Sequence, residues 1–222
     1  FYQWSQNAKT KQAAIAGKVT KIQLYKETII FLWAPTILLF GIIWLEPLSF
    51  IDLGVPLQAT SAELYGALIV LSIVGYFALS YKSMTKNEQT RLKVKEQMAS
   101  LSWFMPHTKA QLNWFTYGVS VSAGICEELI FRGYLLHLLS GYMAMPAAVA
   151  TSCILFGLYH SYQGLQGIIK TSIMGLIFTL LYLWTGSLVV AIVLHIVVDV
   201  YAGALFYVAN KGQYPSEQSR PA

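Results

Sequence analysis

The chain has 222 residues, of which 56% are hydrophobic, 14% aromatic and only 11% charged, and its net charge is +5. A soluble domain carries about a quarter charged residues, so this composition indicates a membrane protein, and the length suits one compact domain. Eleven of the fifteen basic residues lie in two stretches, five within 9–26 and six within 82–109. This segregation excludes a uniformly basic nucleic-acid-binding protein.

Six apolar stretches follow one another along the chain. A helix needs about 20 such residues to cross a hydrocarbon core of ~30 Å. The stretches span residues 28–45, 62–81, 113–139, 146–160, 165–185 and 187–208. We therefore predict an all-α fold, a polytopic transmembrane helical bundle of about six spans.

Helix-breaking residues refine these spans. Pro35 predicts a kink in the first span, Pro146 suits the start of the fourth, and Thr-Gly-Ser at 185–187 predicts a tight turn. The fourth span has only some fifteen residues and stops at His160, where the polar stretch 161–167 follows. Irregular backbone within a membrane is tolerated only against protein or a water-filled cavity. This pattern predicts a short broken helix beside a polar pocket that opens to the cytoplasm.

The charge of the loops predicts the orientation. The N-terminal segment and the loop 82–112 are basic, whereas the loop 46–61 has two acidic residues and no Lys or Arg. By the positive-inside rule both basic segments are cytoplasmic, and an even number of spans returns the C-terminus to that side. The chain is then divided into a cytoplasmic basic segment (1–27), two transmembrane helices with a basic cytoplasmic loop (28–112), a four-helix core (113–208) and a disordered tail (209–222).

Ionisable side chains interrupt the apolar stretches of the four-helix core. A charge at membrane depth costs about 2.5–3.5 kcal/mol on insertion scales, so such residues are functional candidates. The candidates are Glu127, Glu128, Arg132, His160, His195 and Asp199. At a rise of ~1.5 Å per residue, the acidic and histidine side chains of the three helices fall near mid-membrane and predict a common site.

The spacing of these residues predicts their pairing. Glu128 and Arg132 are four residues apart and share a helix face, so we expect an ion pair, while Glu127 lies ~100° further round and points into the bundle. Three carboxylates face one arginine, so another carboxylate must be protonated, or offset by a histidinium or a metal ion. A carboxylate beside an imidazole is the arrangement that general-base activation of water needs.

Three motifs follow one another on successive predicted membrane helices: Glu-Glu-x-x-x-Arg (127–132), Phe-x-x-x-His (156–160) and His-x-x-x-Asp (195–199). In this order they resemble the CPBP family, the CAAX proteases and bacteriocin-processing enzymes, which includes the type II CAAX prenyl endopeptidases. The resemblance covers about residues 113–200. The first motif alone would be a weak signal, whereas three ordered motifs in hydrophobic helices are specific.

The resemblance implies an intramembrane glutamic-type endopeptidase whose catalytic core is the segment 113–208. Glu127 would be the general base that activates water, helped by His160. Glu128 and Arg132 would hold the first motif together.

The resemblance also assigns the remaining residues of the motifs. His195 and Asp199 would face the substrate carbonyl as an oxyanion site, and Phe131 and Phe156 would wall the substrate pocket. The prenyl endopeptidases tend to have Asn where this chain has Asp199. An ionised Asp cannot donate a hydrogen bond to an oxyanion. Asp199 would therefore act protonated, or would orient and charge His195.

We expect no cofactor. Zinc is conceivable from the glutamates and histidines, but the chain has no His-Glu-x-x-His motif and its two candidate histidines stand on separate helices. Cys126 and Cys153 lie in apolar runs and are expected to be buried small hydrophobes. The expected partners are a hydrophobic or prenylated peptide substrate and the lipid bilayer, with no nucleic acid, and the oligomeric state stays open. The implied location is a bacterial plasma membrane, with multiple passes and cytoplasmic N- and C-termini.

Two other classes of function remain open from the sequence. A non-catalytic binding protein of the same fold, such as a bacteriocin-immunity factor, would tolerate replacement of Glu127. An ion-coupled carrier would use the charged cluster as a proton relay. The carrier is the weaker alternative, because the sequence has no visible inverted repeat.

Overall fold

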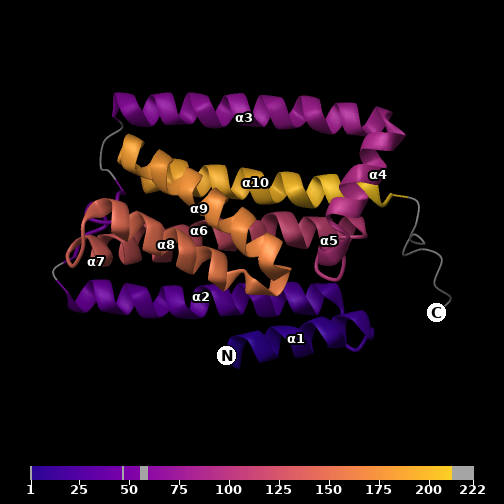
Figure 1. Cartoon of the computed structure of the whole chain (residues 1–222), viewed down its shortest axis with the longest axis horizontal. Helices are drawn as coiled ribbons and strands as arrows, with labels where there is room; N and C mark the ends of the chain where they lie inside the picture. The colour runs from indigo at the N-terminus through magenta and orange to yellow at the C-terminus, as the bar shows by residue number, and fades with distance from the viewer. Residues whose placement is uncertain (1, 47, 56–59, 212–222) are drawn as a thin grey trace. The chain divides into compact units, whose positions relative to one another are not determined.

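The computed structural model describes residues 2–46, 48–55 and 60–211, and within these ranges every regular element is a helix (Figure 1). Four helical stretches in this part of the chain are long and apolar enough to cross a membrane. They are α2 (Lys21–Leu45), α3 (Ser61–Lys86), the turn η4 (Ser161–Gln163) together with α9 (Gly164–Thr185), and α10 (Leu188–Ala209). The predicted all-α polytopic fold is confirmed.

The other two predicted spans are helical but differ from a regular long helix. The third is a continuous helical run in which two π-helical segments alternate with α-helix. Its parts are α5 (Lys109–Asn113), η2 (Trp114–Ser120), α6 (Val121–Glu128), η3 (Leu129–Leu135) and α7 (Leu136–Ser140). The fourth is α8 (Met145–Tyr159), an apolar helix of 15 residues. The total of six membrane crossings therefore stays a prediction.

The break after α8 falls where the sequence places it. Pro146 lies in the first turn of α8, and His160 ends the helix with φ −90° and ψ 19°. Gly164 follows with φ +79°, a conformation that side chains disfavour, and α9 begins there. At its other end α9 stops at Gly186 (φ +65°), the centre of the predicted tight turn.

The described chain forms two compact units, each assembled from segments that are far apart in sequence. The first unit comprises Phe1–Ile29, Ile73–Val121 and Val197–Ala222, and the second comprises Ile30–Ser72 and Ser122–Ile196. The division predicted from sequence follows chain order instead, with segments 1–27, 28–112, 113–208 and 209–222, and it stays a prediction. Most of the tail predicted to be disordered, 212–222, lies outside the described residues.

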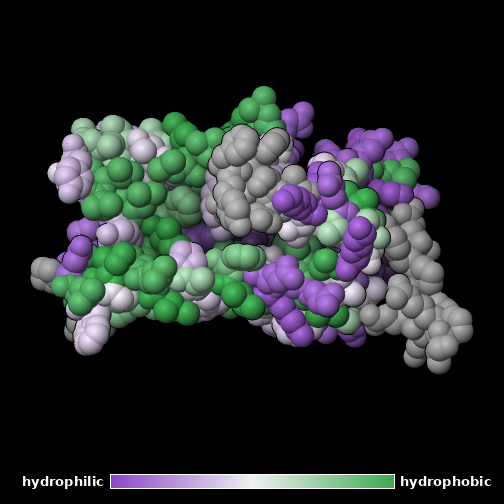
Figure 2. Space-filling view, turned by 90° about the horizontal axis from the view of Figure 1, so that it is seen from below, coloured by the Kyte–Doolittle hydropathy of each residue, from purple (hydrophilic) through white to green (hydrophobic). Residues whose placement is uncertain are grey.

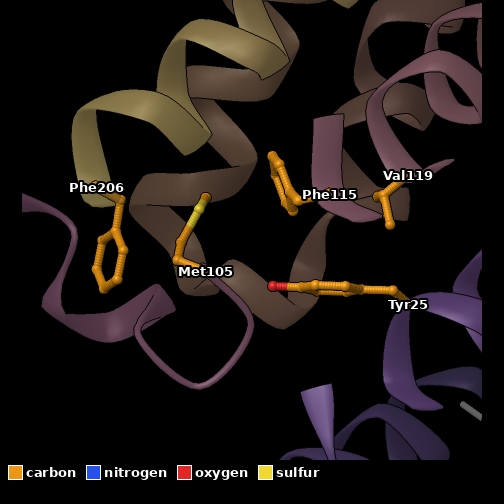
Figure 3. Close-up of a cluster of buried hydrophobic side chains, with 5 residues drawn as sticks. All are labelled: Tyr25, Met105, Phe115, Val119 and Phe206. Carbon is orange, nitrogen blue, oxygen red and sulfur yellow. The ribbon is translucent and has the colours of Figure 1, made fainter. Parts of the chain in front are cut away.

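The first unit has an aromatic core, drawn in Figure 3. It is made of Tyr25, Met105, Phe115, Val119 and Phe206, all of them buried. The Tyr25 hydroxyl donates a hydrogen bond of 2.7 Å to the carbonyl of Phe104, which ties α2 to the loop before α5. This unit also contains the helices α1 (Tyr2–Ile15), α4 (Glu88–Gln97) and η1 (Ala99–Leu101).

Helix α2 begins at Lys21, seven residues before the start predicted from hydropathy at residue 28. The basic segment predicted as 1–27 therefore includes the first turns of α2, and its boundary stays a prediction. The two lysines in these turns are accommodated by their partners. Lys21 Nζ donates to the carbonyls of Ser102 (2.6 Å) and Met105 (2.5 Å), and Lys26 Nζ lies 5.2 Å from the centre of the Trp114 ring.

The second unit is held by aliphatic side chains of α2, η3 and the loop before α3. Its buried cluster is Leu39, Ile43, Leu53, Leu129 and Leu188. Helices α8 and α9 pack side by side in this unit (Figure 1), and Gly157 allows their close approach. A Cβ at Gly157 would collide with the Ser172 hydroxyl and the Ile168 carbonyl of α9.

Large apolar side chains cover the outer faces of the long helices. Phe31 and Leu38 of α2 are 72% and 71% exposed, and Leu165 of α9 is 73% exposed. Figure 2 shows hydrophobic (green) side chains over much of the left part of the drawn face and hydrophilic (purple) patches mainly on the right. An exposed apolar surface of this extent on helices of membrane-crossing length is suited to contact with lipid tails.

The loop before α5 gives a prediction about pH and stability. Burial and, to a smaller extent, the nearby Lys21 ammonium lower the pKa of His107 to about 4. The unfolded chain binds this proton near pH 6.5. Between these two values the unfolded state binds more protons than the folded state, so lowering the pH through this window destabilises the fold. We expect wild-type protein to lose more thermal stability between pH 7 and pH 5 than His107→Gln does, measured by unfolding in neutral detergent.

The control for this prediction is His137→Gln, because His137 is exposed on α7. It should keep the pH dependence of the wild type. An equal loss of stability in wild type and His107→Gln would show that the His107 imidazole does not titrate as the structure indicates.

Candidate active site

Glu128, at the end of α6, is the centre of a buried polar cluster in the second unit. Its side chain has no exposed surface. Arg132 Nη1 donates to Glu128 Oε1 at 2.7 Å, and His195 Nδ1 lies 2.7 Å from the same oxygen. The i,i+4 ion pair predicted from the sequence is thus present, and the structure adds the histidine of α10 to it. Charge-assisted hydrogen bonds of this length are the strong ones.

Arg132 is held on every side. Its Nη2 donates to the carbonyl of Gly175 (3.1 Å), and its Nε donates to the hydroxyl of Thr179 (3.3 Å). The guanidinium carbon lies 4.2 Å from the centre of the Phe156 ring and 5.5 Å from that of Phe178. A planar guanidinium suits this combination of forked donors and aromatic faces.

The backbone and Glu128 fix the orientation of both imidazoles. His160 Nδ1 lies 2.9 Å from the carbonyl of Phe156. A carbonyl only accepts, so Nδ1 of His160 carries the proton. His195 turns its own Nδ1 toward the Glu128 carboxylate, which likewise accepts. In their neutral forms, both rings therefore present an unprotonated Nε2 on their opposite edge.

Glu127 faces these two Nε2 atoms. Its Oε2 lies 3.8 Å from Nε2 of His160 and 3.9 Å from Nε2 of His195. This oxygen is buried, and no described residue forms a hydrogen bond with it. The distances are too long for direct hydrogen bonds and are those at which a bridging water is to be considered. Three acceptors thus converge on one small space, and a proton donor such as water would satisfy them.

Aromatic rings surround this space. The rings of Phe131 and Phe156 pack edge to face, with 5.1 Å between their centres. The centre of the Phe156 ring also lies 4.8 Å from that of the His160 ring. The ring centres of Phe131 and Tyr159 are 6.0 Å apart. The side chain of His160 is 12% exposed and that of Glu127 only 7%.

Five of the six ionisable residues singled out in the sequence are brought together here, with Phe131 and Phe156 beside them. Asp199 is half-buried on α10, one turn after His195, and belongs to the first unit. Its role stays a prediction.

The sequence analysis missed the contribution of α9. Gly175, Phe178 and Thr179 lie on one face of this helix. The ring of Phe178 stacks on that of His195, with 4.9 Å between the ring centres and an angle of 22° between the ring planes. A Cβ at Gly175 would lie 3.0 Å from both Arg132 Nη2 and the Phe156 ring, so a side chain there would push the guanidinium or the ring aside by a few tenths of an ångström. The sequence signal was a Gly and a Thr four residues apart in the apolar second half of α9, which is the spacing of one helix face.

The π-helical segments also were not visible in the sequence. Segment η3 begins directly after Glu128 and carries Phe131 and Arg132. Such single-turn π segments within α-helices occur frequently at functional sites.

In the described part of the chain, no group of three or more His, Cys, Asp or Glu side chains is arranged to hold a metal ion. Cys126 and Cys153 are buried and free. Absence of a cofactor stays a prediction.

The hydroxyl of Thr179 gives a prediction about stability. Thr179→Val keeps the shape of the side chain and removes the acceptor for Arg132 Nε. Because a buried charged donor is then left without that partner, we expect a loss of about 1–3 kcal/mol in the free energy of unfolding. The matched control is Thr171→Val on the same helix, since the Thr171 hydroxyl bonds only to carbonyls of its own helix. Denaturation of both variants in detergent should separate them, and equal losses would show that the Arg132 contact contributes nothing.

Comparison with known proteins gives one match. Residues 109–201 match the family model described as Type II CAAX prenyl endopeptidase Rce1-like. The matched range contains all six ionisable candidates, from Glu127 to Asp199. No curated protein and no solved structure matches the chain.

Proposed function

We propose that this chain, which belongs to the CAAX protease family through its match to the type II CAAX prenyl endopeptidases, cleaves peptide bonds with a water molecule activated by Glu127. The family makes it a protease that acts on peptides in a membrane environment, and the four helices of membrane length make it an integral membrane protein. The glutamate-based chemistry and the hydrophobic or lipid-associated nature of the substrate are the proposed part.

The observation that carries the proposal is the position of Glu127 Oε2, 3.8 and 3.9 Å from the Nε2 atoms of two histidines. A water placed between them donates one hydrogen to the carboxylate and the other to an imidazole. Its oxygen lone pairs then point away from these acceptors. A general base must be within hydrogen-bond reach of the proton it takes, directly or in the complex with substrate.

The reaction follows from this arrangement. The water oxygen bonds to the carbonyl carbon of the scissile peptide while Glu127 takes up the water proton. The resulting oxyanion is stabilised by His195 in its imidazolium form, which takes up a proton on Nε2 from solvent before the reaction and whose charge Glu128 balances. Breakage of the carbon–nitrogen bond follows, and Glu127 returns its proton to the leaving nitrogen. Asp199 is proposed to act protonated at the oxyanion or to orient His195.

The apolar surroundings support a substrate that is itself hydrophobic. Phe131 and Phe156 border the space before Glu127, and the helices that carry the site expose apolar side chains. A hydrophobic or prenylated peptide would enter partly from the bilayer. In a bacterium, such an enzyme would process or mature peptides. We propose that no metal ion takes part.

Glu127→Gln tests the proposal, because it keeps the shape of the side chain and removes the base. We expect cleavage of a mixed library of hydrophobic and prenylated peptides to fall about 10²–10⁴-fold, the range for loss of a general base. The matched control is Glu27→Gln, since Glu27 is exposed near the start of α2. Purified protein in detergent is used, with and without a zinc chelator. Cleavage that resists the chelator and is lost in Glu127→Gln supports the glutamic mechanism, whereas loss with chelator alone points to a metal.

The same variant separates the alternative functions. If Glu127→Gln keeps full biological activity, the peptidase hypothesis is wrong and a non-catalytic binding or immunity protein replaces it. A carrier would instead show solute uptake into proteoliposomes driven by a pH gradient, and Glu127→Gln would abolish that uptake.

A further inference from the structure

The first unit contains a cavity that takes no part in the proposed reaction. Its volume is about 550 Å³, and it lies between α1, the first turn of α2 and the loop 99–107. The polar residues that line it are Lys11, Lys21, Ser100, Ser102, Trp103 and His107. Among the described residues, the lining contains two ammonium groups, two hydroxyls and an indole N–H, and no carboxylate. These groups favour an anionic ligand.

The charge of this cavity is not balanced by the protein. In the described part of the chain, all ion pairs involve Glu127 or Glu128, so neither Lys11 nor Lys21 has a carboxylate within 4.0 Å. Lys21 is the more constrained of the two. Its partners are two carbonyls and the ring of His107, all uncharged acceptors when that ring is neutral. A partly buried cation without a counter-ion gains free energy when an anion occupies the adjacent space.

The depth of the cavity along α2 indicates where the anion comes from. Lys21 precedes the apolar run that starts at residue 28 by seven residues, about 10 Å along the helix axis. The headgroup layer extends roughly 5–7 Å beyond the hydrocarbon core on each side. The backbone of Lys21 thus lies just outside the headgroup layer if α2 crosses the membrane, and long lysine side chains of the cavity can reach back to the lipid phosphates. Trp103, in the wall of the cavity, belongs to a residue type that is enriched at this level.

We propose that this cavity binds the phosphate of an anionic lipid headgroup. Lys11 and the Ser100 hydroxyl would contact the phosphate oxygens directly. Lys21, whose three donors are already directed at protein acceptors, would contribute its charge. Binding would connect α1 to the loop 99–107, because the ligand would contact both. A zwitterionic headgroup would bind less well, since its quaternary ammonium would meet two lysines.

The test compares lipids and free phosphate on the full-length protein in neutral detergent. Phosphatidylglycerol and phosphatidylcholine with the same acyl chains are titrated separately, and inorganic phosphate is titrated against chloride of the same ionic strength. Thermal unfolding reports stabilisation, because a ligand that binds only the folded state raises the midpoint. Native mass spectrometry counts the bound lipids. We expect phosphatidylglycerol to raise the midpoint in a saturable way, with one lipid bound, and phosphatidylcholine to do so less.

Lys11→Gln is the test variant, because Lys11 makes no hydrogen bond that the loop 99–107 needs. The matched control is Lys18→Gln, an exposed lysine of the same basic segment that does not line the cavity. We expect Lys11→Gln to weaken phosphatidylglycerol binding about fivefold, the loss for one lysine at a membrane surface, and Lys18→Gln to leave it unchanged. Ser100→Ala provides a second, uncharged variant, and it should also weaken binding.

The outcomes decide between sources of the ligand. If millimolar inorganic phosphate alone reproduces the stabilisation and Lys11→Gln abolishes it, the cavity binds a free phosphate and the lipid assignment is wrong. If both lipids stabilise equally, or if Lys11→Gln and Lys18→Gln weaken binding equally, the cavity is not an anion site and the proposal is overturned.

Discussion

The second unit depends on one buried oxygen atom, Oε1 of Glu128, which Arg132 and His195 approach at the same distance of 2.7 Å. A buried charge is costly unless it is paired and hydrogen-bonded. The arginine supplies the opposite charge, and the histidine supplies a second donor from another helix. Removing either partner would leave a charge in an apolar interior. This oxygen therefore joins η3 to α10 and fixes the imidazole edge that faces Glu127.

The helices surrounding this oxygen supply what the charges need. Arg132 has N–H donors left after its ion pair with Glu128. They donate hydrogen bonds to a backbone carbonyl of α9 and to the Thr179 hydroxyl. The aromatic rings of Phe156 and Phe178 cover the guanidinium. Glycine at position 175 favours this contact, because a Cβ there would lie only 3.0 Å from the guanidinium and would crowd it. Stability of the fold and orientation of the candidate catalytic groups thus have the same physical origin.

Two cations, the buried Arg132 and the partly buried Lys21, are stabilised in different ways. Arg132 is paired with a carboxylate and enclosed by the second unit. Lys21, in the first unit, is surrounded by neutral acceptors next to a donor-rich cavity. The first arrangement is complete within the protein, whereas the second leaves a charge for an external anion to balance. The candidate active site thus rests on a buried charge that is paired within the protein, whereas the proposed lipid site rests on a partly buried charge that has no carboxylate partner in the described part of the chain.

The sequence by itself determined the class of fold and most of the site. Hydropathy and helix length specify membrane helices wherever they occur, so the long apolar helices, the break at His160 and the turn at Gly186 were all predictable. Helical spacing specifies local pairs such as Glu128 and Arg132. Only the tertiary structure decided which other elements complete the site. Phe178 and Thr179 reach Arg132 from more than forty residues away, and no local pattern encodes a contact between distant helices. The early start of α2 likewise depends on a distant contact, because Lys21 in its first turn donates hydrogen bonds to two carbonyls of the loop before α5.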